Sequence, residues 1–161
     1  MADRPSADDG SGSDAGSASG SDAGSGSSSS AAAEQLLALG DEHFVSLTTF
    51  RKSGAAVSTP VWIVRDGDTL LVTTPDDTGK VKRLRNDARV ELRPSSRMGA
   101  VREGEPVRHG VATIESDAAS VERGSGLFRR KHPVEYRVFM LVERIAAKTQ
   151  KPRVMLRIRP A

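Results

Sequence analysis

The sequence of 161 residues contains no cysteine. This absence excludes disulfide bonds, thiol catalysis and cysteine-bound metal sites. The sequence also lacks an apolar run long enough to cross a bilayer. Its N-terminal segment has neither the basic start nor the apolar stretch of a secretory signal. The sequence therefore predicts a cytoplasmic protein without a membrane span.

Aromatic residues and catalytic motifs are also scarce. One tryptophan, one tyrosine and four phenylalanines offer few surfaces on which nucleic-acid bases could stack. The histidines His43, His109 and His132 lack metal-ligand spacing such as H-E-x-x-H, and we expect each to be a surface or packing residue. There is no G-x-S-x-G elbow and no P-loop. We predict no metal site and no catalytic side chain acting alone, so an enzyme of this sequence would use a cofactor.

The first 33 residues are almost all serine, glycine, aspartate and alanine. Such a segment buries too little apolar surface to offset its loss of chain entropy, so we predict a flexible tail at 1–33 and one domain at 34–161. The tail holds one arginine against five aspartates, a net charge of −4, and the whole chain carries +3. The domain therefore carries +7, which indicates either an anionic partner or a merely basic surface.

Alternating apolar and polar residues predict strands joined by tight turns at residues 52–54 and 66–67. The spacing of Val81 and Leu84 predicts a short helix after the third strand. We expect a mainly β fold, a small barrel of about six antiparallel strands with flanking helices, whose edges are exposed unless they close or pair with another subunit. The expected strands are 44–51, 55–64, 69–74, 88–93, 107–115 and 153–159; the expected helices are 34–39, 78–87, 117–130 and a stripe of Val134, Val138, Leu141, Val142 and Ile145.

The start of the helix in "TGKVKRLRND" is a candidate anion site. The first amides of a helix lack internal partners and lie at the positive end of its dipole. Gly79 lets a ligand approach the backbone, Thr78 supplies a hydroxyl and Lys80 supplies a mobile charge. A phosphate fits this arrangement. The alternative is a capped helix whose basic residues face water.

Pro60 stands in a predicted strand, close to the only tryptophan, Trp62. Proline cannot donate a ladder hydrogen bond, so it marks an edge strand or a bulge, and a bulge leaves backbone groups free for a ligand. Ser58 and Thr59 add hydroxyls, and Trp62 adds a flat apolar surface. The segment is either the wall of a binding site or a hairpin with Trp62 in the core.

The segment "FVSLTTFRKSGAAVSTPVWIVRDGDTLLVTT", followed by "TGKVKRLRNDARVELRP", closely resembles the pyridoxamine 5′-phosphate oxidase-like split-barrel superfamily. Within it, the sequence is similar to small actinobacterial proteins classed as F420-dependent oxidoreductases. The resemblance extends from residue 34 to the C-terminus. It implies a homodimeric split β-barrel that binds a flavin or deazaflavin in a cleft between the subunits.

The resemblance also indicates which cofactor to expect. In the flavin oxidases a Ser-Arg-Lys run holds the cofactor phosphate; here it corresponds to Thr78-Gly79-Lys80, which lacks the arginine. Those oxidases also carry an arginine and a lysine on the second strand, where this sequence has Thr59 and Val64. These losses favour coenzyme F420, whose acidic glutamyl tail suits a domain of charge +7, over FMN.

The implied function is hydride transfer between the reduced deazaflavin and a small organic substrate. Lys80 and the amides near Gly79 would hold the phosphate, with Arg83 in support. Tyr136 would shape the substrate pocket or belong to the core. The alternatives are a cofactor carrier of the same fold without turnover, an FMN-dependent oxidoreductase and, from charge alone, a nucleic-acid-binding barrel. The residues expected to line the cofactor ring are Ser58, Thr59, Pro60, Val61 and Trp62.

Overall fold

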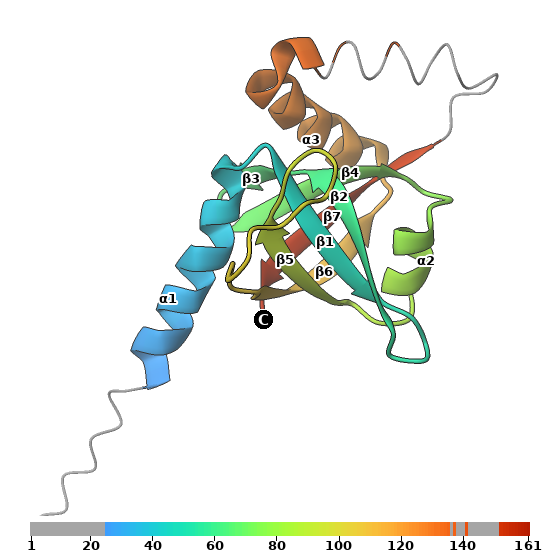
Figure 1. The fold of residues 1–161 in the computed structure, drawn as a ribbon. Coiled ribbons are helices and arrows are strands. Elements are labelled where there is room, and N and C mark those ends of the chain that lie inside the picture. The colour runs from blue at the N-terminus through green and yellow to red at the C-terminus, as the bar shows by residue number, and fades with distance from the viewer. Residues whose placement is uncertain (1–24, 136, 138–140, 142–151) are drawn as a thin grey trace, which may run out of the picture.

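A computed structural model of the chain describes residues 25–135, 137, 141 and 152–161 (Figure 1). Strands dominate this part of the chain, and all of its strand pairings are antiparallel. The helices are α1 (Ser25–Leu37), the 3-10 helix η1 (Ala38–Asp41), α2 (Gly79–Leu84) and α3 (Ala118–Lys131). The strands are β1 (Phe44–Phe50), β2 (Ala56–Trp62), β3 (Val64–Asp66), β4 (Thr69–Pro75), β5 (Arg89–Pro94), β6 (Arg108–Glu115) and β7 (Arg153–Pro160).

Strands β2 and β3 form the two ends of the sheet, whose order is β2-β1-β5-β6-β7-β4-β3. Only Ile63 separates them along the chain. The sheet must therefore curl until its end strands meet, and this produces the half-barrel visible in Figure 1. The curled antiparallel sheet with flanking helices confirms the predicted fold class. The described residues form seven strands, not six, because the predicted strand 55–64 breaks at Ile63.

Two apolar clusters lie on the two faces of the sheet. The larger one fills the barrel with alternate strand residues such as Val45 and Leu47, because successive side chains of a strand point to opposite faces. Helix α2 contributes Val81 and Leu84 to this cluster, so its basic residues, of which Lys80 and Arg83 are half-buried, surround a buried anchor. The smaller cluster lies between the sheet and α3 and consists of Val64, Leu71, Phe128 and Met155, with Trp62, Val121 and Leu127 against it.

Helix α1 begins at Ser25, earlier than the predicted start at residue 34. Three alanines and Glu34 have high helix propensity and extend the helix back into the serine run. Residues 25–33 are therefore helical. The last turn of α1 is anchored through the buried side chains of Leu36 and Leu37. Residues 1–24 lie outside the described residues, so the tail and the domain division remain predictions.

Helix α3 begins at the predicted position, with Asp117 as its N-cap. The Asp117 carboxylate accepts a hydrogen bond from the backbone N–H of Ser120 at 2.9 Å. Gly124 is required in the middle of this helix, because a Cβ there would lie 2.8 Å from the Met155 sulfur on β7. The glycine lets α3 pack closely against the sheet, which compensates for its low helix propensity.

The chain after α3 is described only in part. Of the helical stripe predicted there, Val134 and Leu141 are exposed. Val138, Val142 and Ile145 lie outside the described residues, as does Tyr136.

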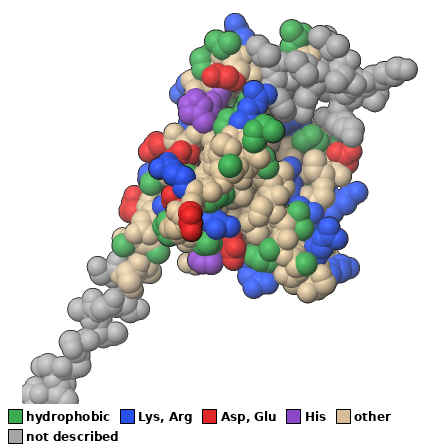
Figure 2. Space-filling model, in the orientation of Figure 1, with side chains coloured by type: hydrophobic (Ala, Val, Ile, Leu, Met, Phe, Trp, Pro, Cys, Tyr) green, Lys and Arg blue, Asp and Glu red, His purple; other side chains and the backbone are tan. Residues whose placement is uncertain are grey.

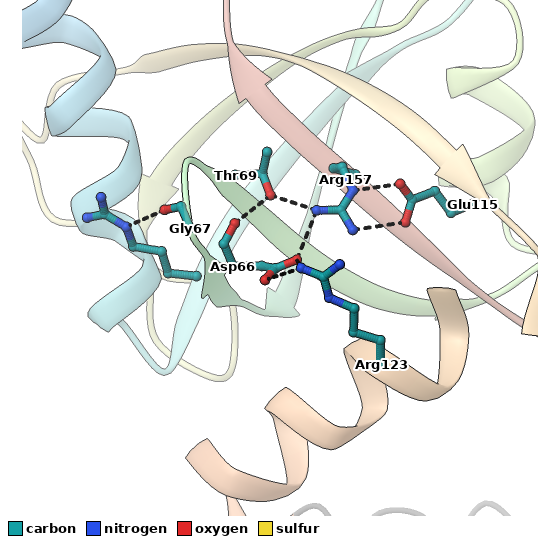
Figure 3. A network of polar contacts seen from close by, with 7 residues as sticks. Asp66, Gly67, Thr69, Glu115, Arg123 and Arg157 are labelled. Atoms are coloured by element: carbon teal, nitrogen blue, oxygen red, sulfur yellow. Dashed lines mark hydrogen bonds and ion pairs between the residues drawn. The ribbon is translucent and has the colours of Figure 1, made fainter. Parts of the chain in front are cut away.

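Arg157 on β7 links its own strand to β3, β4 and β6 beside α3 (Figure 3). Its guanidinium donates to both carboxylate oxygens of Glu115, at 2.6 and 3.2 Å, and to Asp66 Oδ2 at 3.0 Å and Thr69 Oγ1 at 2.9 Å. Arg123 of α3 donates to both oxygens of Asp66 at 2.9 Å.

Burial raises the pKa of Asp66, but the hydrogen bonds from the two arginines outweigh it, so the pKa lies below its ordinary value of 3.8. The stabilisation from this carboxylate is therefore present above the ordinary pKa and is lost as pH falls through the lowered one.

Replacing Arg157 with methionine should destabilise the fold, because it leaves the Asp66 and Glu115 side chains, 12% and 21% exposed, without their shared partner. We expect a loss of about 2 kcal/mol, less than for a fully buried pair because solvent screens part of the charge. Urea unfolding should show a lower midpoint at an unchanged m-value. The control is Arg89→Met, which breaks the exposed pair with Asp87 and should leave the midpoint near that of the wild type. Equal midpoints for Arg157→Met and the wild type would contradict this role.

Candidate cofactor-binding site

The first turn of α2 brings the predicted anion-binding residues together. Thr78 occupies the N-cap position, but its hydroxyl donates to the Pro75 carbonyl at 3.0 Å instead of capping a helix amide. Gly79 is exposed, and a Cβ at this position would lie 3.0 Å from Arg83 Nη1. The glycine therefore leaves space for the Arg83 guanidinium to fold back over the start of the helix.

Basic side chains gather around this turn, each held by a threonine hydroxyl. Lys80 Nζ donates to Thr74 Oγ1 at 3.0 Å, and Arg83 Nε donates to Thr49 Oγ1 at 2.8 Å. Arg153 Nε, at the start of β7, donates to Thr73 Oγ1 at 3.1 Å. Neither Lys80 nor Arg83 forms an ion pair with a carboxylate of the described residues. We call Lys80, Arg83 and Arg153 the cationic cluster; Figure 2 shows lysine and arginine side chains gathered on the side of the molecule where α2 lies.

Within the cationic cluster, Lys80 and Arg83 lie close to other positive charges and have no carboxylate partner among the described residues. Burial lowers the pKa of Lys80, and the positive charges of Arg83 and Arg153 lower it further. Burial likewise lowers the pKa of Arg83, with a smaller contribution from the charge of Arg51. A bound anion would offset this repulsion and accept hydrogen bonds from the N–H groups of Lys80 and Arg83. The donors present therefore fit a phosphate.

Strand β2 pairs with β1 in an unbroken register from Phe44 opposite Trp62 to Phe50 opposite Ala56. Because β2 is an end strand of the sheet, Pro60 is accommodated at an edge, the first of the two predicted positions, and no bulge is needed. Alternation divides the predicted ring-lining residues between two faces. Ser58, Pro60 and Trp62 share the outer face, whereas Thr59 and the buried Val61 point toward the barrel interior.

Trp62 is half-buried and packs against two other rings. Its indole stacks on the imidazole of His132 with centroids 5.6 Å apart and an interplanar angle of 15°, and it lies 6.1 Å from the Phe44 ring. On the same face, the hydroxyls of Thr48 and Ser58 lie 2.8 Å apart and share a hydrogen bond. Trp62 packs against the outer cluster and keeps part of its surface accessible, and its role as a wall of a binding site stays a prediction.

Thr49 links the two halves of the candidate site. Its fully buried hydroxyl accepts the hydrogen bond from Arg83 and lies 3.5 Å from the Val57 carbonyl on β2, at the limit of a hydrogen bond. Sequence reasoning missed Thr49, as it missed Thr73, Thr74 and Arg153. The signal was the paired threonines in "SLTTF" and "VTTP". In each pair one hydroxyl faces the barrel interior and the other faces outward, and a buried hydroxyl on either face needs a polar partner.

The histidines do not form a metal site. His132 is buried, His43 lies 5.0 Å from its ring, and His109 is exposed on β6, 4.0 Å from Glu91. Within the described ranges, no three histidine, aspartate or glutamate side chains gather closely enough to hold a metal ion. No helix in these ranges has the length and apolar character needed to span a membrane.

Solved structures share this fold at low sequence identity. A *Listeria innocua* protein assigned as a pyridoxamine 5′-phosphate oxidase aligns with a TM-score of 0.51 and 17% identity over 80% of this chain and 92% of its own. An F420 reductase aligns with a TM-score of 0.50 and 17% identity over 77% and 91%. The heme storage protein HutZ from *Vibrio cholerae* aligns with a TM-score of 0.57 and 10% identity over 80% and 87%. At these identities the likeness establishes the fold alone.

A search among curated proteins found no match. The family model described as pyridoxamine 5′-phosphate oxidase matches residues 30–161. Because that match runs from the middle of α1 through the whole sheet to the C-terminus, the chain belongs to the pyridoxamine 5′-phosphate oxidase family.

Proposed function

We propose that the protein is an F420-dependent oxidoreductase that transfers hydride between the reduced deazaflavin and a small organic substrate. The observation that carries this proposal is the cationic cluster at α2, in which Lys80 and Arg83 lack a carboxylate partner among the described residues. Such a cluster is costly unless an anion occupies it, and the cofactors of this family carry a phosphate.

The β2 strand favours a deazaflavin over a flavin. The flavin oxidases use an arginine and a lysine at the positions of Thr59 and Val64, and neither residue here can replace them. Val64 is 2% exposed and packs in the cluster beneath α3, and Thr59 is uncharged and points toward the barrel interior. A flavin ring would therefore lose two charged contacts, one at Thr59 on β2 and one at Val64 at the start of β3.

The geometry of the site supports a separate role for each group. Reduced F420, when bound, would supply a hydride from its C5 position. Lys80 and Arg83 would hold the phosphate, with the exposed backbone at Gly79 beside them. Ser58, Pro60 and the accessible part of Trp62 would form the surface against the ring. The protein would thus provide orientation and a dry apolar wall.

The remaining assignments are also proposals. A homodimer would place a second subunit over the accessible face of β2 and enclose the cofactor. The cytoplasmic location, and the absence of nucleic acid and membrane among the partners, remain predictions from the sequence. A cofactor carrier of the same fold is the second candidate, favoured by the ring-facing residues Ser58, Pro60 and Trp62, none of which is a ready acid or base.

Titration of the purified protein with oxidised F420 and, separately, with FMN tests the cofactor assignment. We expect F420 to bind with a Kd of about 1 μM or tighter, and FMN much more weakly because its expected contacts at Thr59 and Val64 are missing. Cofactor fluorescence is the readout. Tighter binding of FMN would reverse the assignment, and F420 binding without turnover of a broad substrate panel would favour the carrier.

Lys80→Ala tests the phosphate contact. Loss of one charge-assisted hydrogen bond should weaken F420 binding by about 10- to 100-fold and reduce its salt dependence. Lys82→Ala is the matched control, because Lys82 lies on the same helix with its side chain exposed to solvent. The affinity of Lys82→Ala for F420 should remain near that of the wild type. If both variants bind F420 as the wild type does, Lys80 does not hold the phosphate.

A further inference from the structure

His132 is a buried imidazole that the proposed hydride transfer does not use. It follows the last residue of α3 and is 1% exposed. Its Nε2 atom is shielded from solvent and has no hydrogen-bond partner among the described residues. A buried polar atom without a partner is uncommon in folded proteins and calls for an explanation.

The surroundings of His132 are aromatic. One face stacks on Trp62, and its edge meets the ring of His43 at 5.0 Å with an interplanar angle of 72°. The Phe44 ring also contacts Trp62, with centroids 6.1 Å apart. His132, at the C-cap of α3, is therefore a direct contact between the end of this helix and the outer face of β2.

Lys131 fixes the backbone on which this stack depends. Its ammonium group donates to the carbonyl oxygens of Gly40 at 2.6 Å, Glu42 at 2.5 Å and Ile63 at 3.0 Å. Glu42 precedes His43, and Ile63 follows Trp62. Lys131 thus binds the backbone next to the start of β1 and the end of β2 from outside the barrel. The adjacent His132 imidazole stacks directly on the Trp62 indole.

The charges around His132 disfavour its protonated form. Burial lowers its pKa, and the positive charge of the adjacent Lys131 and the nearby His43 lower it further. Glu135, beyond the end of α3, opposes these effects but does not outweigh them. The neutral ring suits the stack, whereas a protonated ring would bury a charge beside Lys131 without an acceptor at Nε2.

We propose that His132 is a positioning residue that holds Trp62 in place as the cofactor wall and releases it when the imidazole takes up a proton. The role of Trp62 as a wall rests on the proposed function, but the coupling between the two rings does not. Because the unfolded chain takes up this proton more readily than the folded one, stability falls as pH drops below the ordinary histidine pKa toward the lowered value. The site is therefore intact at neutral pH and loosens in acid.

The intrinsic fluorescence of the full chain tests the coupling, because Trp62 is its only tryptophan. Emission is recorded without cofactor from pH 8 to pH 5. We expect a single transition with a midpoint below the ordinary histidine value of about 6.5. His132→Phe keeps an aromatic ring that cannot be protonated and should abolish the transition. His132→Gln, also unable to titrate, serves the same purpose if the phenylalanine variant does not fold.

Two further variants separate this coupling from a general effect of acid. His109→Phe replaces an exposed histidine on β6 and should retain the wild-type transition. His43→Gln removes a positive neighbour and should move the midpoint to higher pH. A wild-type emission that stays constant over this range, or a transition that persists in the folded His132 variants, would overturn the proposal.

Measurement of F420 affinity over the same pH range tests whether protonation of His132 weakens cofactor binding at Trp62. If the cofactor binds only the form with neutral His132, wild-type affinity relative to His132→Phe should fall by about tenfold for each pH unit below the midpoint. Parallel pH profiles for the two proteins would refute the effect on binding. If no variant binds F420, the proposed function fails and Trp62 is no cofactor wall, while the fluorescence data still decide whether His132 controls the indole.

Discussion

The connection of one residue, Ile63, between the two end strands of the sheet is the constraint on which the rest of the structure depends. A single residue spans only about 3.5 Å, so β2 and β3 can lie at opposite ends of the strand order only if the sheet closes on itself. Closure creates the interior that α2 anchors into, and it brings the end of β2 beneath the end of α3. Both halves of the candidate site follow from this one connection.

The two faces of the curled sheet make different contacts. The inner face is apolar except where threonines near one end hold the basic residues of α2, so the charge is gathered where the barrel opens. The outer face carries α3. This helix is held by the Arg157 network on one side and by the contacts of Lys131 and His132 on the other. Helix α3 is therefore fixed by polar contacts at both flanks and by the close approach at Gly124 in its middle.

Much of this could be predicted from the sequence, because strand alternation and turn residues are local signals. The main strands, the turns at Gly54 and Gly67 and the start of α3 follow from such signals. The break at Ile63 could not be predicted, since "VWIVRD" has no turn residue and its division arises from barrel closure. The grouping of Lys80 and Arg83 was predictable from one helix. Their threonine partners and Arg153 come from distant strands, and the stack of Trp62 on His132 joins residues 70 positions apart.

Pro60 also has a consequence for how this chain can associate with others. It lies near the end of an edge strand whose register with β1 is unbroken, so its missing N–H interrupts the outward row of backbone donors. A second chain cannot add a continuous strand along β2, and this protects the edge against sheet-to-sheet aggregation. Any stable association of this strand with another subunit must use side-chain surfaces, not backbone ladders. One proline thus closes the edge of β2 to strand addition and leaves the side-chain face of Ser58 and Trp62 as the surface through which this strand could associate.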